Sequence, residues 1–276
     1  MKKTEKERLD ILLVKKGFFI TREKAKRAIM AGEILVENQK SLKVGQKINI
    51  DSNISVLKKK TDYVSRGGDK LDKAILEFNV SAEGKRVIDI GASTGGFTDC
   101  LLKYGAKEVY CIDVGYGQLA WKLQKDPRVI IMDRTNIRHL TPEKFKQLFE
   151  LATIDVSFIS LEKVLPAVYR LLIAKGEVIA LIKPQFEAGR EYIQRGGIVK
   201  KSEIHQMVIE KVGNAALGLN FSIRGVTFSP IKGGASGNIE YLIYLVKNST
   251  EDKIQDFYRK TEEVVKKAHY ELSMKK

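Results

Sequence analysis

The stretch from Val87 to Asp99 constrains the fold of this chain more than any other part of the sequence. A short apolar run with an acid, Asp89, near its end stops at the glycine-rich residues 91–96, and a helical pattern that starts at Phe97 follows at once. This order predicts a buried strand, a tight loop and a helix. Because glycine has no Cβ, the backbone N–H groups of such a loop can approach a ligand closely.

The spacing of the glycines in this loop argues against two common phosphate-binding loops. A dinucleotide-binding loop reads G-x-G-x-x-G, whereas the glycines here are Gly91, Gly95 and Gly96. A P-loop continues with a lysine after its last glycine, whereas Phe97 follows here. A ligand without phosphate is therefore favoured, and Asp89 with the loop amides suits the amino-acid end of S-adenosylmethionine. An ordinary strand-to-helix turn is the alternative interpretation.

From Lys85 onward, strand-like and helix-like segments alternate. Strands are expected near residues 86–91, 108–113, 129–133, 152–158 and 177–183, and helices near 97–104, 117–125, 141–150, 162–173 and 202–216. This alternation predicts a parallel sheet covered on both faces. Two last strands, 221–229 and 238–246, are joined by a segment too short for a helix, so they must pair antiparallel at the sheet edge. A final amphipathic helix is expected over 250–272.

The predicted fold is therefore α/β, with a mostly parallel, seven-stranded, Rossmann-like sheet and an antiparallel terminal hairpin. This is the architecture of class I methyltransferases, and it strengthens the interpretation of the glycine loop as a site for S-adenosylmethionine. An acid at the end of the second strand, Asp113, would suit the ribose hydroxyls of that cofactor.

The charge of the chain is concentrated near its beginning. Of the net charge of +15, residues 1–66 contribute +9, because they carry 17 Lys or Arg and 8 Asp or Glu. Such a balance favours a polyanion as the partner. With 43% hydrophobic residues, the 276-residue chain can form one large core and one small one.

The cysteines and the first residues of the chain bear on its compartment. Cys100 and Cys111 give no disulfide framework, and no Cys/His spacing suggests a metal site. The first residues are charged and lead into an amphipathic helix rather than a signal-peptide core, and no apolar stretch is long enough to span a bilayer. We therefore expect a cytoplasmic protein with no bound metal and no stable membrane insertion.

Residues 8–57 are predicted to form a small α/β unit. Leu9, Leu12 and Leu13 make one face of a first helix that ends near Gly17. A second helix is expected after an N-cap at Thr21, and Gly32 is its expected end. Short strands follow at 34–36 and 47–50, with a turn at Asn38 and Gln39.

This unit resembles the S4 RNA-binding domain. The resemblance covers about fifty residues and rests on Arg8–Asp10, Arg22–Lys26, Ile29, Gly32 and Ile34–Val36 with Asn38. It implies that basic side chains contact RNA phosphates with little base readout. The candidate RNA-binding residues are Arg8, Arg22, Lys24, Lys26, Arg27 and, beyond the unit, Arg66. A solvated helix face is the alternative for the basic residues of the second helix.

Polar residues stand where the strands of the large sheet are expected to end, and ligands bind at that edge in sheets of this type. Asp155 lies in the end of the fourth strand, Lys183 ends the almost wholly apolar fifth strand, and Glu240 lies in the opening of the last one. Long charged side chains are rarely buried without a partner. Lys183 is therefore expected to pair with Asp155 and Glu240.

The residues around Asp155 favour a hydroxyl group as the methyl acceptor. Enzymes that methylate amino groups of bases carry a Pro-Pro pair after the polar residue, which Asp155–Phe158 lacks, and no cysteine lies where a cytosine-C5 nucleophile is needed. A lysine among carboxylates suits a hydroxyl. The sulfonium methyl is already activated, so the enzyme has to align the two reactants and relieve the hydroxyl of its proton.

Over about residues 6–248, the chain resembles the FtsJ-like 2′-O-methyltransferases and, with the S4 module in front, the TlyA family, also called haemolysin A. The motifs that carry the resemblance are Ser65–Leu71, Asp89–Asp99, Asp155–Leu161, Ile182–Glu187 and Gly237–Tyr241. The resemblance implies a catalytic tetrad, which falls here on Lys70, Asp155, Lys183 and Glu240. It also implies ribose 2′-hydroxyls of ribosomal RNA, in both subunits for some members, as the acceptor, and ribosomal RNA or a ribosomal subunit as the partner.

Roles for these residues follow as hypotheses. Lys183 either stabilises the 2′-alkoxide or removes its proton, Asp155 orients Lys183, and the other two tetrad members position the ribose. The cofactor-binding candidates are Asp89, Gly91, Ser93, Thr94, Gly95 and Gly96 at the methionine end, Asp113 at the ribose and Asp133 at the adenine. Structural ion pairs are the alternative for the tetrad, and an ordinary strand-end acid is the alternative for Asp133.

The domain prediction is an S4-like RNA-binding domain over 1–57, a basic linker over 58–68 and an FtsJ-like methyltransferase domain over 69–276. One rival interpretation is an RNA-binding ribosome-assembly factor whose methyltransferase domain is inactive, and the complete tetrad weighs against it. Another is a membrane-active haemolysin, which the absence of any membrane-span-length apolar segment disfavours.

Overall fold

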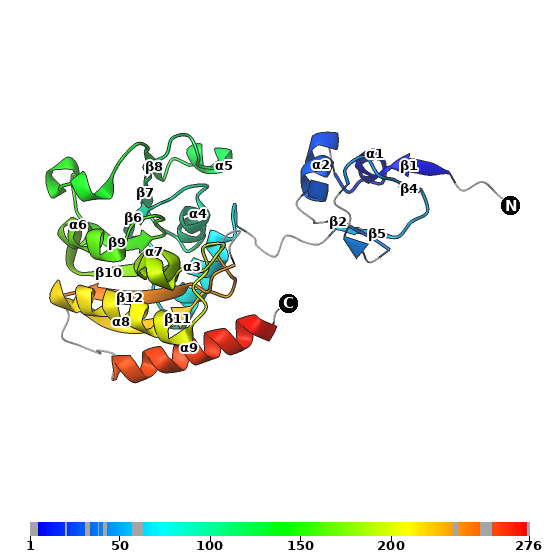
Figure 1. The fold of residues 1–276 in the computed structure, drawn as a ribbon. Helices are drawn as coiled ribbons and strands as arrows, with labels where there is room; N and C mark the ends of the chain where they lie inside the picture. The colour runs from blue at the N-terminus through cyan, green and yellow to red at the C-terminus, as the bar shows by residue number, and fades with distance from the viewer. Residues whose placement is uncertain are drawn as a thin grey trace. The chain divides into compact units, whose positions relative to one another are not determined.

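The computed structural model describes residues 5–19, 21–30, 34–37, 39–40, 43–56, 63–233, 237–248 and 256–274. The chain divides into two compact units, residues 1–62 and residues 63–276 (Figure 1). Each unit has a hydrophobic core of its own. The predicted linker overlaps the second unit, because Gly67 and Gly68 already belong to its first helix.

The first unit packs two helices against short strands. Its elements are β1 (Lys6–Arg8), α1 (Leu9–Lys15), α2 (Arg22–Met30), β2 (Ile34–Val36), β3 (Gln39–Lys40), β4 (Lys47–Asn49) and β5 (Ile54–Val56). β2 pairs with β3 and β5, and β1 pairs with β4. Both predicted helices and the strands near 34–36 and 47–50 are confirmed, whereas β1, β3 and β5 were not predicted. Gly32 and Asn38 lie outside the described residues.

The second unit contains a seven-stranded sheet in the order β11-β12-β10-β9-β6-β7-β8. Its strands are β6 (Arg86–Ile90), β7 (Glu108–Ile112), β8 (Val129–Met132), β9 (Phe149–Ile154), β10 (Leu172–Ile182), β11 (Phe221–Phe228) and β12 (Tyr241–Lys247). The five strands from β10 to β8 are parallel, and β12 runs antiparallel to both β10 and β11. The predicted α/β sheet with an antiparallel end is confirmed.

Helices cover both faces of this sheet (Figure 1). They are α3 (Gly67–Phe78), α4 (Gly96–Lys103), α5 (Trp121–Gln124), α6 (Leu165–Leu171), α7 (Pro184–Glu187), α8 (Ser202–Gly218) and α9 (Phe257–Met274). One apolar cluster joins the sheet to α6, α8 and α9, and another joins it to α3, α4 and α5. Among the described residues, every helix is too short or too polar to cross a membrane.

The helix predicted over 141–150 is wrong. Only a 3₁₀ turn, Pro142–Lys144, forms there, and β9 begins at Phe149. The spacing of Phe145 and Phe149 is helical, but both rings pack edge-to-face against Tyr110 of β7, with ring centroids 5.7 and 5.0 Å away. Tertiary packing of the aromatic rings therefore overrides the local helical pattern.

Two other predicted helices are shorter than expected. The helix predicted over 162–173 is α6, which starts at Leu165 with a proline in its first turn and ends because β10 begins at Leu172. The helix predicted over 117–125 is only α5, four residues long. Of the last predicted helix, 250–272, the part described is α9.

Candidate active site

Three members of the predicted tetrad lie at the same edge of the sheet because of strand register. Asp155 directly follows β9, and Lys183 directly follows β10. β10 pairs with β12 so that Ile182 lies opposite Tyr241, and the residues one step further along each strand are Lys183 and Glu240. The hydrogen-bond ladder of the sheet thus brings together residues that are up to 85 positions apart in sequence.

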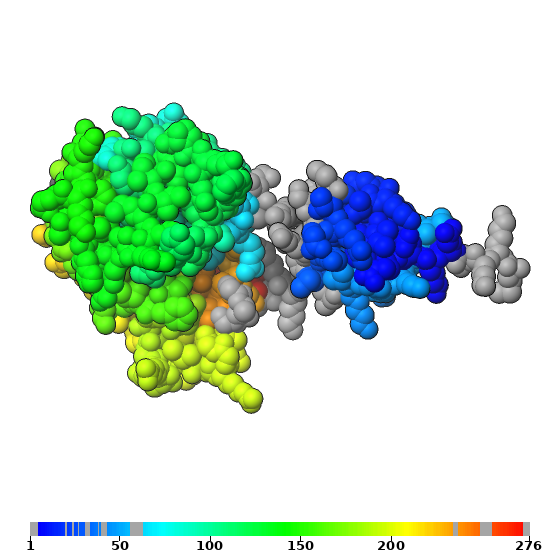
Figure 2. All heavy atoms as spheres, turned by 90° about the horizontal axis from the view of Figure 1, so that it is seen from above, coloured from blue at the N-terminus to red at the C-terminus, as the bar shows by residue number. Residues whose placement is uncertain are grey.

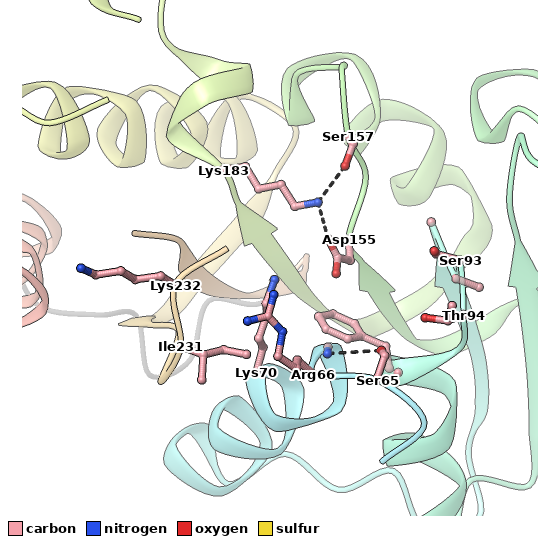
Figure 3. A pocket seen from close by; sticks show the side chains of 15 residues that line it. Ser65, Arg66, Lys70, Ser93, Thr94, Asp155, Ser157, Lys183, Ile231 and Lys232 are labelled. Carbon is pink, nitrogen blue, oxygen red and sulfur yellow. Dashed lines mark hydrogen bonds and ion pairs between the residues drawn. The ribbon is translucent and has the colours of Figure 1, made fainter. Parts of the chain in front are cut away.

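Lys183 is held by two groups of the loop that follows β9 (Figure 3). Its Nζ lies 2.5 Å from Asp155 Oδ1 and donates a hydrogen bond of 3.0 Å to Ser157 Oγ. The Lys183 side chain is 11% exposed and that of Asp155 is 21% exposed. The ammonium is therefore largely enclosed, yet it can still meet a molecule that enters the site.

The other half of the tetrad is a second, more deeply buried ion pair. Lys70 projects from α3, and its Nζ lies 2.5 Å from Glu240 Oε2. The side chains are 10% and 3% exposed, respectively. The side chain of Glu240 also accounts for the glycine at position 233, because a Cβ on Gly233 would lie 2.0 Å from Glu240 Oε1. The predicted tetrad is thus two lysine–carboxylate pairs.

Two cavities meet at this edge. The first, of about 280 Å³, has a cationic lining that includes Arg66, Lys70, Lys183 and Lys232. Figure 3 shows the side chains around it. The second, of about 410 Å³, is lined mainly by apolar groups such as Val114, Ile137 and Phe158, together with Asp113 and Asn136. Both cavities are lined by Gly91, Ser93, Asp155 and Ser157.

The glycines of the loop after β6 are required by close contacts within the chain itself. Gly91 has φ +82°, and a Cβ there would lie 2.5 Å from the carbonyl oxygen of Asp155. A Cβ on Gly96 would lie 2.2 Å from Ser65 Oγ. Gly91 and Gly96 line the first cavity, whereas a Cβ on Gly95 would point at leucine side chains, 2.3 Å from the nearer one.

The three candidate cofactor acids have different surroundings. Asp89 is fully buried, and its carboxylate accepts hydrogen bonds from Thr98 Oγ1 at 2.6 Å and Thr153 Oγ1 at 2.8 Å. Burial raises the pKa of Asp89 to about 6, although these hydrogen bonds oppose the rise. Asp89 is not among the residues that line either cavity. Its hydrogen bonds connect β6 to α4 and to β9 below the glycine loop.

Asp113 lines the second cavity, and each of its carboxylate oxygens accepts one backbone hydrogen bond. The donors are the N–H groups of Ser93, at 2.8 Å, and Gly115, at 2.7 Å. Asp133 accepts a hydrogen bond from the N–H of Gly117 at 2.8 Å and lines neither cavity. Thr94, the remaining loop candidate, lines the first cavity.

The candidate RNA-binding residues of the first unit are organised by a buried acid. Arg8 Nε and Arg22 Nε lie 3.0 and 2.6 Å from the two carboxylate oxygens of Asp10, which is fully buried. Burial raises the pKa of Asp10, but the hydrogen bonds from the two arginines together lower it by more. The net pKa of Asp10 is therefore below its usual value. Lys26 pairs with Glu23 at 2.8 Å. The side chains of Lys24 and Arg27 lie outside the described part of the chain.

Sequence reasoning missed several residues of the site. Ser65 and Lys232 line the first cavity, and Ser157 binds Lys183. Phe158 is 90% exposed with φ +63°, and its ring packs against Phe186, 4.9 Å between centroids. Ser65, Ser157 and Phe158 lie inside motifs that carry the family resemblance, but no role was predicted for them. Lys232 lies outside every such motif, and tertiary structure alone brings it to the cavity.

Comparison with known proteins gives the family of each unit. Residues 63–247 match the family of FtsJ-like methyltransferases, and residues 7–54 match the S4 domain. The putative rRNA methyltransferase YqxC of Bacillus subtilis is 51% identical over 243 residues, which cover 88% of this chain and 86% of that protein. The 16S/23S rRNA (cytidine-2′-O)-methyltransferase TlyA of Mycobacterium tuberculosis is 39% identical over 242 residues, 86% of this chain and 89% of that one.

A solved structure covers almost the same length. It is described as a putative hemolysin from Streptococcus thermophilus, and it is 48% identical, with a TM-score of 0.78 over 99% of both chains. The likeness therefore extends over both units.

Proposed function

Because this chain belongs to the TlyA family of FtsJ-like methyltransferases with an S4 domain, we propose that it transfers a methyl group from S-adenosylmethionine to a ribose 2′-hydroxyl of ribosomal RNA. The observation that carries the proposal is the position of Lys183. Lys183 lines the cationic cavity, and Asp155, which its ammonium contacts, lines both that cavity and the largely apolar one. An acceptor and a donor molecule could meet there.

The second cavity has the chemistry that the adenosyl part of the cofactor requires. Apolar side chains such as Val114 and Ile137 offer walls for a planar base, and Asp113 offers carboxylate oxygens for ribose hydroxyls. Each of these oxygens already accepts one backbone N–H and can accept another hydrogen bond. The N–H groups of the glycine loop suit the carboxylate at the methionine end. Arg66, which the sequence predicts to bind RNA, lines the same cavity and could also meet that carboxylate.

When bound, S-adenosylmethionine supplies an electrophilic methyl group on a sulfonium sulfur. The chain has to bind the acceptor ribose, orient its 2′-oxygen and manage one proton. In our proposal Lys183 donates a hydrogen bond to that oxygen and stabilises the negative charge that develops on it, while the proton of the hydroxyl passes to solvent water. Asp155 and Ser157 fix the position of the ammonium.

The first unit is proposed to bind the RNA. Arg8 and Arg22 share one buried carboxylate, which holds their guanidinium groups in fixed positions while 40% and 49% of their side chains remain exposed. Fixed guanidinium groups bind phosphates with a smaller loss of side-chain entropy than mobile ones. This part of the proposal predicts binding that weakens steeply with salt.

The test is the substitution Lys183→Ala, with Lys260→Ala on the exposed face of α9 as the matched control. Ribose methylation of ribosomal RNA, read by mass spectrometry, should fall about a thousand-fold in the first variant and stay unchanged in the second. Calorimetry should show the same affinity for S-adenosylmethionine in both.

Methylation retained by Lys183→Ala would contradict the assignment of this residue. If the unaltered chain bound ribosomal RNA but not S-adenosylmethionine, the rival interpretation of an RNA-binding assembly factor would stand instead.

A further inference from the structure

The segment that connects β7 with α5 carries two large aromatic side chains that the fold leaves exposed. Tyr116 is 71% exposed and Trp121 is 69% exposed. They stand five residues apart, and Trp121 is the first residue of α5. Val114, at the start of the segment, is also exposed, whereas Leu119 and Leu123 are buried. Exposed apolar side chains that are gathered in one short segment are more often part of an interaction site than single scattered ones are. We therefore expect Tyr116 and Trp121 to contact a binding partner.

Each of these rings has a cation on one of its faces. Lys125 Nζ lies 4.4 Å from the centroid of the Trp121 ring, and the guanidinium carbon of Arg134 lies 4.5 Å from that of Tyr116. Lys125 and Arg134 are both exposed. An aromatic ring with a neighbouring cation offers a π-surface for a base and a positive charge for the adjoining phosphate.

This segment is fastened to the edge of the sheet that holds the candidate site. The N–H of Arg134 donates to the carbonyl of Gly115 at 2.9 Å, and the N–H of Ala120 donates to the carbonyl of Thr94 in the glycine loop at 3.2 Å. Val114, at its start, lines the second cavity. α5 lies beside β8, and both are near the top of the second unit in Figure 1. Figure 2 views the second unit from that side.

We propose that Tyr116, Trp121, Lys125 and Arg134 form a second RNA-binding surface, which stacks unpaired bases of the substrate strand. The inference rests on the proposed function and adds to it a surface within the methyltransferase unit. A single-stranded or looped segment is the fitting occupant, because bases in a duplex do not present their faces to a protein. The two cations favour a phosphate backbone over a protein partner, and residues 67–276, which contain this surface, carry a net charge of +6.

The chain supplies its own probe, because Trp121 is its only tryptophan. The full-length protein is titrated with an unstructured RNA of about 12 nucleotides, while tryptophan fluorescence and the anisotropy of a labelled copy of the RNA are recorded in parallel. Stacking of a base on the indole should quench the fluorescence with the same midpoint as the anisotropy change. Trp121→Ala should weaken RNA binding about tenfold, whereas Tyr270→Ala, a matched exposed aromatic on α9 that is 67% exposed, should leave it unchanged.

RNA binding without quenching would overturn the proposal that these residues stack bases. Equal RNA affinity of Trp121→Ala and the unaltered chain would overturn it as well. Either result is also what a surface that serves a protein partner would give. Methyl transfer to ribosomal RNA by the unaltered chain is measured alongside. Its absence would reject the proposed function, whereas methyl transfer that persists without quenching would reject only the stacking surface.

Discussion

The two lysine–carboxylate pairs of the site have the same N···O distance, 2.5 Å, in different surroundings. Lys183 and Asp155 both line the first cavity, and a hydroxyl group from Ser157 supports the lysine. Lys70 and Glu240 join α3 to the start of β12, and the carboxylate is 3% exposed. Separating the first pair would leave Asp155 partly in contact with solvent. Separating the second would leave the charge of Glu240 buried without a cation.

The largest expected effect comes from breaking the buried pair. Lys70→Met should lower the free energy of unfolding by about 3–5 kcal/mol, because Glu240 would lose its cation inside the protein. Urea denaturation of the two proteins measures this difference.

The double variant Lys70→Met/Glu240→Leu sharpens the same comparison. It should recover most of the lost stability, because two apolar side chains replace a buried ion pair at little net cost. Methylation should remain low in the double variant. If Lys70→Met alone unfolded at the same urea concentration as the unaltered chain, the two pairs would not differ as we describe.

The next effect concerns the pair of Lys183 and Asp155, and it is an effect on the rate of methylation rather than on stability. Asp155→Asn should slow methylation about 100- to 1,000-fold, because the ammonium of Lys183 would lose the group that orients it. The free energy of unfolding should fall by less than in Lys70→Met, because Asp155 is 21% exposed and Ser157 still accepts a hydrogen bond from the ammonium. Single-turnover methylation and urea denaturation together separate the two outcomes, and a large loss of stability with normal turnover would reverse the assignment.

Asp89 extends the comparison, because among the described residues no cation is paired with it. Burial raises its pKa from 3.8 to about 6, and the charge of Asp155 adds to the rise. Between about pH 4 and pH 6 the folded chain therefore binds more protons than the unfolded chain, so the free energy of unfolding falls as the pH rises. By pH 7 this single group should have removed about 2 to 3 kcal/mol. Thermal or urea unfolding across this pH range measures it.

The control for this prediction is Asp89→Asn, which keeps the shape and removes the titration. In that variant the contribution of this position should vanish and the pH profile should be flatter. Identical profiles for the two proteins would show that Asp89 does not titrate in this window.

The smallest expected effect belongs to Ser157. Its hydroxyl accepts one hydrogen bond from Lys183 at 3.0 Å, and the ion pair with Asp155 remains when it is removed. Ser157→Ala should slow methylation about tenfold, which corresponds to one lost hydrogen bond to a charged group. Ser202→Ala, at the start of α8, is the matched control and should have normal turnover. Equal rates for both variants would remove Ser157 from the site.

Much of the sheet could be predicted from the sequence because its strands are apolar and end in charged residues. Lys183 follows a run of buried residues, and this contrast identified both the strand end and a site residue. The failed prediction at 141–150 has the opposite cause. Phe145 and Phe149 have helical spacing, but the ring of Tyr110, which lies 35 positions earlier in sequence than Phe145, determines how they pack.

The division of the site into two ion pairs could not be predicted in the same way. The sequence suggested that Lys183 pairs with both Asp155 and Glu240, whereas Glu240 binds Lys70. The position of α3 relative to β12 decides this choice, and that position depends on packing between elements rather than on a local pattern. For the same reason Ser65 was not predicted to contact Gly96.

The pairing of Ile182 with Tyr241 has a consequence for how this chain can change length. Side chains along a strand alternate between the two faces of a sheet, so a one-residue deletion inside β10 would move Lys183 to the opposite face while leaving its identity intact. The enzyme should therefore tolerate insertions in its outer loops and lose activity when a single codon is deleted from β9, β10 or β12.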